Sequence, residues 1–212
     1  MNLFIFDWSG VISDDRKPVY EANTRLLRER GLKILTFDEF LLNTDLTAAE
    51  FLAKRGLVGT QEELLLSYKR YFDIVISKGV IPQIYVDVKE VLAYLSMRDK
   101  ILAVLSSHPE ENLKQEARTY GIEQYFRCIA GNSRDKSEGI VRIVEDSGIR
   151  REETIYLGDT IYDIRAAKKA GVHSAAISGP DGQQRGYHSR QRLETEQPDF
   201  LLDSLEDLKT FF

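Results

Sequence analysis

Polar side chains of catalytic types follow three apolar segments of the chain. Asp7 comes directly after the run LFIF, Ser106 after ILAVL, and Asp159 just beyond IYL, with Gly158 between. If the three runs are parallel strands of one sheet, these residues meet at its carboxyl edge, where open α/β sheets bind their ligands. Carboxylates placed there can hold a hard metal ion or act as a nucleophile.

Two further features run against the ordinary electrostatics of a helix. Asp159 and Asp163 are four residues apart, and like charges at that spacing on one helix face repel by roughly 0.2–0.5 kcal/mol. Lys136 falls in the first turn of a predicted helix, the end that disfavours a cation by roughly 0.3–1 kcal/mol. A bound cation and a bound anion would reverse both penalties, so the pattern predicts a pocket for a metal ion and a phosphate. Taken singly, each residue also fits a helix cap, a turn or a solvated surface position.

Continuous apolar runs predict the strands that would position these residues. Uninterrupted rather than alternating apolar residues are typical of strands buried on both faces of a parallel sheet. The runs lie at 3–6, 101–105, 126–130, 155–157, 173–177 and 199–202.

Helix signals separate the runs from residue 84 onward. Asp87 and Asp135 each precede a glutamate by three residues, the spacing of a capping box, and Pro109 suits a first helical position. Helix stops follow at Gly121, Gly148 and Gly171. This alternation predicts an α/β fold, a Rossmann-like doubly wound parallel sheet with LFIF central between ILAVL and IYL.

Residues 13–83 differ in texture from the rest of the chain. They show no convincing strand, and their apolar residues recur at helical spacing. One such helix face comprises Leu65, Tyr68, Phe72, Val75 and Ile76. We expect a core domain from 1–12 plus 84–212 and a small inserted helical cap domain, 13–83, that covers the carboxyl ends of the strands. The polar, glycine-rich stretch 178–192 is expected to be a surface loop.

Composition excludes several classes of protein. The 212 residues are 42% hydrophobic and 30% charged, and a net charge of −5 argues against a broad basic face for nucleic acid. No apolar run reaches the roughly 18–20 residues of a membrane span, and the N-terminus lacks a secretory pattern. The single Cys128 excludes an intrachain disulfide and is expected to be buried in a strand. We expect a cytoplasmic monomer or homodimer with no nucleic-acid or membrane partner.

Four stretches, taken in order, resemble the motifs of the haloacid dehalogenase (HAD) superfamily of hydrolases. The resemblance is to the helical-cap, phosphoglycolate phosphatase-like type, in which the cap follows the first strand. The matching stretches are FDWSGVISDD (6–15), ILAVLSS (101–107), RDKSEGI (134–140) and IYLGDTIYDIRAAKKAGV (155–172).

The resemblance implies a role for each polar residue of these motifs. Asp7 is in the position of the nucleophile that forms an aspartyl phosphate. Ser106, with neighbouring Ser107, is in the position that binds phosphoryl oxygens, and Lys136 in the position that balances charge between nucleophile and phosphoryl group. The implied Mg²⁺ ligands are Asp7, the backbone oxygen of Ser9 and Asp159, together with Asp163, which would bind the ion through water or orient neighbouring groups.

Ser9 departs from the pattern of the family. HAD phosphatases carry a second aspartate two residues after the nucleophile, where it acts as general acid and then base. A serine hydroxyl does neither well at neutral pH, and loss of a positioned acid or base typically costs ~10²–10⁴ in rate. The resemblance therefore implies a Mg²⁺-dependent phosphatase of a small phosphorylated metabolite that is slow, or that favours good leaving groups such as acyl or aryl phosphates.

Two alternatives stay open at this stage. HAD phosphonatases, which cleave C–P bonds, also lack the second aspartate and use a cap lysine to form a Schiff base; Lys54 is the candidate here. A non-catalytic phosphometabolite-binding protein is the other alternative. A metal-free dehalogenase fits Ser9 and the acidic pair less well. His108 and Tyr20 are candidates for substrate contact by location only.

Overall fold

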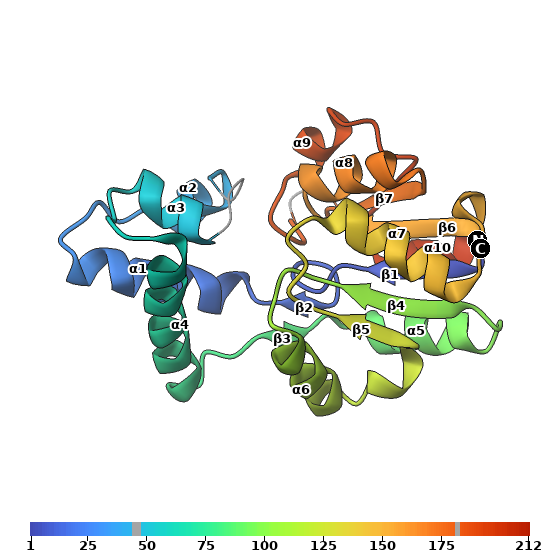
Figure 1. Ribbon diagram of the computed structural model, residues 1–212, viewed down its shortest axis with the longest axis horizontal. Helices are drawn as coiled ribbons and strands as arrows, with labels where there is room; N and C mark the ends of the chain where they lie inside the picture. The colour runs from blue at the N-terminus through green and yellow to red at the C-terminus, as the bar shows by residue number, and fades with distance from the viewer. Residues whose placement is uncertain (44–47, 181–182) are drawn as a thin grey trace. The chain divides into compact units, whose positions relative to one another are not determined.

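The computed structural model describes residues 1–43, 48–180 and 183–212. The chain divides into two compact units, one formed by Met1–Asp14 with Ile84–Phe212 and the other by Asp15–Gln83. The first unit is a layered α/β structure, and the second is built of helices (Figure 1). Among the residues described, no helix is long and apolar enough to cross a membrane.

Parallel strands form the sheet of the α/β unit, in the order β5-β4-β1-β6-β7-β8. The predicted α/β class, and the place of LFIF between ILAVL and IYL, are confirmed. The strands are β1 (Leu3–Phe6), β4 (Ile101–Leu105), β5 (Cys128–Ala130), β6 (Thr154–Gly158), β7 (His173–Ile177) and β8 (Phe200–Leu202). Phe6 pairs with Val104 of β4 on one side and with Leu157 of β6 on the other. The three strands therefore end at the same edge of the sheet.

Helices cover both faces of this sheet. The pleat of β1 separates the two layers, because Leu3 and Ile5 belong to one buried apolar cluster and Phe4 and Phe6 to another. On the first face lie α7 (Lys136–Ser147) and α8 (Ile161–Ala170). On the second lie α5 (Val88–Ser96), α6 (Glu110–Tyr120) and α10 (Leu208–Phe211). Fully burying each such Leu, Ile or Phe stabilises the fold by about 1.5–3 kcal/mol.

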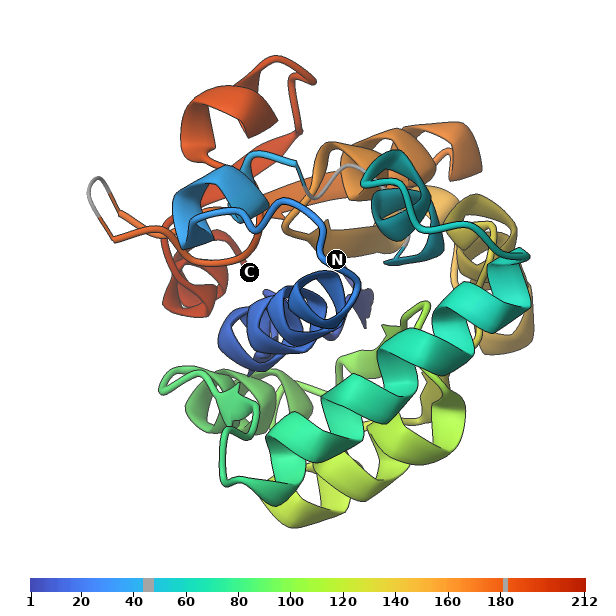
Figure 2. The same ribbon diagram turned by 90° about the vertical axis from the view of Figure 1, so that its left-hand side faces the viewer.

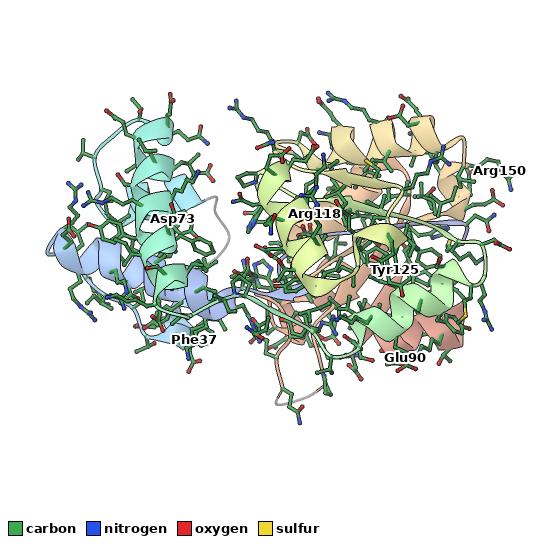
Figure 3. All side chains as sticks on the ribbon, turned by 90° about the horizontal axis from the view of Figure 1, so that it is seen from below. Phe37, Asp73, Glu90, Arg118, Tyr125 and Arg150 are labelled. Carbon is green, nitrogen blue, oxygen red and sulfur yellow. The ribbon has the colours of Figure 1, made fainter. Side chains whose placement is uncertain are left out.

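The outer surfaces of these helices are charged. Glu90 on α5 and Arg118 on α6 are both exposed and mark this surface in Figure 3. Shorter helical segments complete the unit: η1 (Glu123–Tyr125), η2 (Arg151–Glu153), α9 (Arg190–Glu194) and η3 (Leu205–Asp207).

The predicted helix stops are correct, but the predicted starts differ in detail. Gly121, Gly148 and Gly171 cap α6, α7 and α8 in the left-handed conformation. Asp87 precedes α5 but makes no capping box, because its carboxylate accepts hydrogen bonds from Arg185 and from the backbone of Leu205 instead. Pro109 is the residue before α6 rather than its first residue.

The second unit contains α1 (Arg16–Glu29), α2 (Phe37–Leu41), α3 (Ala48–Lys54) and α4 (Gln61–Ser77), of which α4 is the long helix in Figure 2. The buried residues of α4 are Leu64, Tyr71 and Val75, whereas Leu65 is exposed. The buried face of α4 is therefore rotated by about one residue relative to the predicted apolar face. The prediction of no strand in 13–83 was wrong at both ends, where β2 (Ser13–Asp14) pairs with β3 (Gln83–Ile84).

Cys128 is exposed, contrary to the prediction. It does lie on a strand, but β5 is at the edge of the sheet. Successive side chains of a strand point to opposite faces, and here Ile129 is buried while Cys128 is on the open side.

Candidate active site

Asp7 lies directly beyond β1 and is still held to the neighbouring strand. Its backbone N–H donates to the carbonyl of Leu157 at 2.8 Å. Its carboxylate oxygen Oδ1 accepts from the backbone N–H of Trp8 at 2.7 Å, and Oδ2 accepts from Nζ of Lys136 at 2.6 Å. The side chain is 7% exposed. Both carboxylate oxygens are thus oriented by donors within a nearly closed site.

Trp8 fixes the turn that follows Asp7. The indole is fully buried, and Nε1 donates to Oε2 of Glu116 at 2.7 Å. Its ring stacks on Tyr120 with centroids 6.0 Å apart. The Tyr120 hydroxyl in turn lies 2.9 Å from Oγ of Ser13. These contacts join the turn after β1 to α6 and limit how far Asp7 can move.

Lys136 is the first residue of α7, and its position depends on the N-cap. The Asp135 carboxylate accepts from the backbone N–H groups of Ser137 and Glu138 and from Nζ of Lys169, which holds the start of the helix. From there Nζ of Lys136 donates to Asp7 and, also at 2.6 Å, to Oδ1 of Asp163.

Asp163 is held in the first turn of α8 by a capping box with Thr160. The Thr160 hydroxyl donates to Oδ2 of Asp163 at 2.6 Å, and the Thr160 backbone N–H donates to the same oxygen. The Tyr156 hydroxyl donates to Oδ1 at 3.2 Å. Asp159, in contrast, precedes the N-cap, so the prediction that it shares a helix face with Asp163 was wrong. The turn between β6 and α8 brings the two carboxylates together.

Asp7, Asp159 and Asp163 form one buried group, here called the acidic cluster. Each offers a carboxylate oxygen, and these oxygens lie within 4.8 Å of one another. The predicted residues Asp7, Lys136 and Asp163 are thus joined by hydrogen bonds, and Asp159 lies beside them. The loops after two neighbouring strands supply Asp7 and Asp159, and the first turns of α7 and α8 supply Lys136 and Asp163, as parallel-sheet topology requires.

The electrostatics of the cluster show a shortage of positive charge. Burial, opposed by Lys136, raises the pKa of Asp7 to about 6. Burial, reinforced by the charges of Asp163 and Asp7, raises the pKa of Asp159 well above its usual range. Burial alone would raise the pKa of Asp163 too, but Lys136 and the Thr160 hydrogen bonds hold it below its usual value. The carboxylates of Asp163 and Asp7 raise the pKa of Lys136 against the effect of burial.

Ser9 contacts a histidine that sequence analysis had marked by location only. Oγ of Ser9 lies 3.1 Å from Nε2 of His108. The backbone N–H of His108 donates to Oγ of Ser106 at 3.3 Å, and Ser106 is buried at the end of β4. Ser107 is exposed, and its side chain is not among the groups that these hydrogen bonds bring together. His108 therefore links the turn after β1 to the turn after β4.

The stretch 178–192 is not the surface loop that was predicted. Positions 181 and 182 lie outside the described residues, but Arg185 and His188 are buried. The backbone N–H of Tyr187 donates to Oδ2 of Asp159 at 2.6 Å. No local pattern marked these residues, because their partners are distant in sequence. Thr160 was also missed, although its spacing to Asp163 is that of a capping box.

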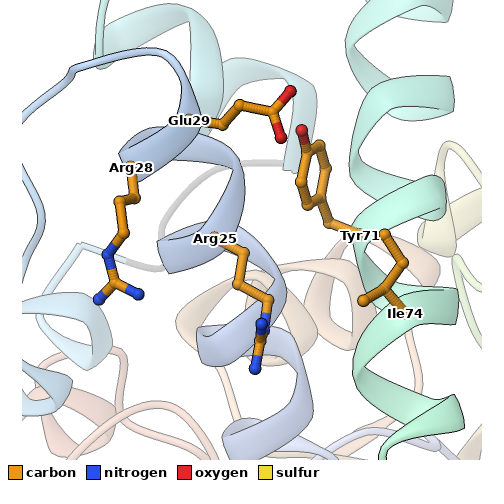
Figure 4. Close-up of a pocket in the computed structure, with 5 residues that line it drawn as sticks. All are labelled: Arg25, Arg28, Glu29, Tyr71 and Ile74. Atoms are coloured by element: carbon orange, nitrogen blue, oxygen red, sulfur yellow. The ribbon is translucent and has the colours of Figure 1, made fainter.

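The helical unit has a hollow of its own, of about 340 Å³, between α1 and α4. None of the predicted site residues lines it, and the Tyr71 hydroxyl points toward Glu29 there (Figure 4). A hydrogen bond between the Tyr71 hydroxyl and the Glu29 carboxylate raises the pKa of Tyr71. The lining residues are Arg25, Arg28, Glu29, Tyr71 and Ile74. Lys54, the candidate for a Schiff base, is exposed on α3.

The acidic cluster fits a hard divalent cation. Its side-chain donors are all oxygens, the ligands that Mg²⁺ prefers. Lys136 brings one positive charge to three buried carboxylates, and burial raises the pKa values of Asp7 and Asp159 in spite of that charge. A divalent ion would supply the missing charge.

Comparison with known proteins agrees with this geometry. The sequence profile of the haloacid dehalogenase-like hydrolases matches residues 4–177. Phosphoglycolate phosphatase 1 of Pseudomonas aeruginosa is 24% identical over 97% of this chain and 78% of its own length. The phosphoglycolate phosphatase of Synechococcus elongatus is 23% identical over 98% of this chain and 95% of its own.

A solved structure shares the whole fold. A haloacid dehalogenase-like hydrolase from Streptococcus pneumoniae superposes with a TM-score of 0.86 at 19% identity, covering 100% of this chain and 98% of that one. The profile match extends over most of the chain, so the protein belongs to the haloacid dehalogenase-like hydrolases, as the sequence motifs implied.

Proposed function

We propose that this hydrolase is a Mg²⁺-dependent phosphatase that cleaves a small phosphorylated metabolite through an aspartyl phosphate on Asp7. The observation that carries the proposal is the bridge of Lys136, whose ammonium donates to both Asp7 and Asp163 at 2.6 Å within the acidic cluster. A buried carboxylate beside a fixed ammonium and two further carboxylates suits a nucleophile that must approach an anionic phosphate.

The chemistry is divided into two steps. A carboxylate oxygen of Asp7 bonds to phosphorus, and the bond from phosphorus to the substrate oxygen breaks, with its electron pair left on that oxygen. Water then attacks the phosphorus of the aspartyl phosphate, which releases inorganic phosphate and restores Asp7. Covalent catalysis of this kind replaces one difficult displacement by two easier ones. Mg²⁺, held by Asp7, Asp159, Asp163 and the backbone oxygen of Ser9, would supply the charge that lets two anions approach.

Lys136 and Ser106 would act on the phosphoryl group itself. Lys136 remains beside Asp7 while charge is redistributed, and so balances charge on both the nucleophile and the phosphoryl oxygens. The oxygen of Ser106 accepts from the backbone of His108. A hydroxyl that accepts still has its own proton to donate, and Ser106 can direct it to a phosphoryl oxygen.

The leaving group must take up a proton unless it is stable as an anion. Ser9 stands where relatives of this type have an acid, and its hydroxyl is hydrogen-bonded to His108 rather than acidic. Acyl and aryl phosphates depart without a proton, so they should be cleaved faster than alkyl phosphates of the same size. The names of the two relatives make 2-phosphoglycolate the first alkyl phosphate to test.

The test is phosphate release from a panel that includes 2-phosphoglycolate, acetyl phosphate and p-nitrophenyl phosphate. The wild type should release phosphate with Mg²⁺ and not in EDTA, and Asp7→Asn should be inactive. If the wild type never exceeds Asp7→Asn, the proposal is wrong. Thermal stabilisation by phosphate without turnover would then indicate a binding protein.

Three related expectations stay proposals alongside this one. The helical unit, Asp15–Gln83, would act as a cap that selects the substrate. The protein would work in the cytoplasm, as a monomer or homodimer. No observation favours C–P cleavage, since a Schiff-base lysine works best when desolvated and Lys54 is exposed.

A further inference from the structure

The backbone of residues 185–188, here called the Arg185 segment, donates two hydrogen bonds to Asp159. The N–H of Tyr187 donates to Oδ2 of the Asp159 carboxylate at 2.6 Å. The N–H of His188 donates to the backbone carbonyl of Asp159 at 3.3 Å. Nδ1 of His188 accepts from the backbone N–H of Ile161 at 3.1 Å. The segment therefore follows the whole turn from β6 to α8.

Two glycines let the main chain close on the same carboxylate. A Cβ on Gly186 would lie 2.5 Å from Cβ of Asp159, and one on Gly10 would lie 2.1 Å from Oδ2 of Asp159. The Gly10 position would also come within 2.9 Å of Cα of Gly186. Contacts this short leave no space for a methyl group. Asp159 is thus enclosed between the turn that carries Ser9 and the Arg185 segment.

Arg185 anchors the segment through a buried guanidinium. Nη1 donates to Oδ2 of Asp87 at 2.5 Å, and the two side chains are 8% and 7% exposed. Nη2 donates to the carbonyl of Val11, in the turn after β1. The guanidinium lies 4.1 Å from the ring centre of Tyr85, whose hydroxyl accepts from the N–H of Gly186. One side chain therefore ties the segment to α5, to the turn of Ser9 and to Tyr85.

We propose that Arg185 is a positioning residue that sets the location of the Asp159 carboxylate for Mg²⁺. The inference rests on the proposed function, in which Asp159 is a metal ligand. Arg185 is two residues from Tyr187, whose N–H holds the carboxylate, and it does not belong to the acidic cluster itself. A guanidinium can donate in two directions and lie flat on an aromatic ring at once, which an ammonium cannot reproduce. The chemistry of the site therefore requires arginine here rather than any cation.

Two matched pairs of variants test this in the substrate-free protein. Arg185→Lys keeps the charge but loses the two-directional guanidinium. Its control is Arg190→Lys, because Arg190 pairs with Asp203 and with Glu194 of its own helix, α9, away from Asp159. Gly186→Ala forces Asp159 to move, and its control is Gly148→Ala. Gly186 and Gly148 have φ of 74° and 73°, but nothing lies within 4 Å of a Cβ on Gly148. Each pair thus separates a change at Asp159 from general loss of stability.

The measurement is the Mg²⁺ concentration that gives half of the full shift in melting temperature, with fluorescence of the sole tryptophan, Trp8, as a second readout. Mutating groups that orient a metal ligand typically weakens metal binding by about 10–100-fold. Arg185→Lys and Gly186→Ala should show a loss of that size, and both controls should bind as the wild type does. An unchanged midpoint in a folded Arg185→Lys variant would overturn the inference.

The outcomes also separate this inference from the proposed function. If the wild type binds Mg²⁺ but releases phosphate from nothing in the panel, the phosphatase proposal fails and the positioning role is still decided by the midpoints. If Mg²⁺ does not stabilise the wild type, Asp159 is no ligand and the positioning role is overturned with it.

Discussion

Replacing Lys136 by methionine should destabilise the metal-free protein strongly, although the side chain is only one atom shorter. The Lys136 ammonium donates to Asp7 and Asp163 at 2.6 Å each. At an effective dielectric constant of about 20, each such contact attracts by roughly 6 kcal/mol. Desolvation of the ammonium offsets much of this, and removing one partner of a buried pair costs about 3–5 kcal/mol in practice. For a chain of this size that corresponds to a melting temperature lower by about 6–20 °C.

The loss should depend on pH in a defined direction. Lys136 is a charge that lowers the pKa values of Asp7 and Asp163. Without it both values rise, so the folded variant binds protons that the unfolded chain does not, and its stability increases as pH falls. The difference from wild type in EDTA should therefore be largest near pH 8 and shrink toward pH 6. Mg²⁺ should stabilise the variant more than it stabilises the wild type, because the ion replaces the missing positive charge.

Lys209→Met is a close control for this experiment. Lys209 also donates to two carboxylates at 2.6 Å, and its side chain is 21% exposed against 20% for Lys136. Its partners Glu90 and Glu206 are 74% and 42% exposed, however, so their charges remain solvated when the lysine is lost. The control should lose much less stability than Lys136→Met, because exposed ion pairs contribute little. Equal losses for the two variants, measured by denaturant unfolding in EDTA, would refute the electrostatic reasoning about the cluster.

Three further outcomes are expected. Asp159→Ala should abolish the stabilisation by Mg²⁺ seen in thermal unfolding and the Mg²⁺ dependence of phosphate release; an unchanged response to the metal would remove Asp159 from the site. Ser9→Asp should raise kcat on alkyl phosphates by up to ~10²–10⁴-fold. It should also lower the amount of aspartyl phosphate trapped in a single turnover and weaken inhibition by phosphate. Lower activity in a folded Ser9→Asp variant would indicate a different chemistry. In EDTA, burial raises the pKa of Asp7 to about 6, so the ionisation of Asp7 should cost the wild type about 3 kcal/mol of stability between about pH 4 and about pH 6, measured as the difference between its unfolding titration and that of Asp7→Asn.

The parts of the site that sequence could predict are those with local signals. Asp7 follows an uninterrupted apolar run, and Lys136 follows an N-cap aspartate, so their elements were recognisable without knowledge of the fold. The order of strands then brought both to one edge. Chain topology of parallel sheets is restricted enough that such residues meet once the strands are assigned.

The missed parts depend on pairs of residues far apart in the chain. Arg185 is hydrogen-bonded to Asp87, 98 positions away in the sequence, and Ser9 to His108, 99 positions away. Asp87 had the spacing of a capping box, but its carboxylate accepts hydrogen bonds from the distant Arg185 and Leu205 instead. Cys128 was placed on the right strand but assigned the wrong exposure, because an apolar run does not reveal which strand forms the edge of a sheet.

Charge balance gives a physical reason why serine can be tolerated at position 9. When ionised, the three carboxylates of the acidic cluster carry three negative charges, against one positive charge on Lys136. A bound Mg²⁺ would make that set neutral, so an incoming phosphate would meet no net repulsion. The aspartate that the family resemblance implies at this position would add a fourth carboxylate and leave the set negative. Under the proposed mechanism Ser9 would exchange proton transfer for anion affinity, so restoring the carboxyl should speed turnover and weaken phosphate binding in the same variant.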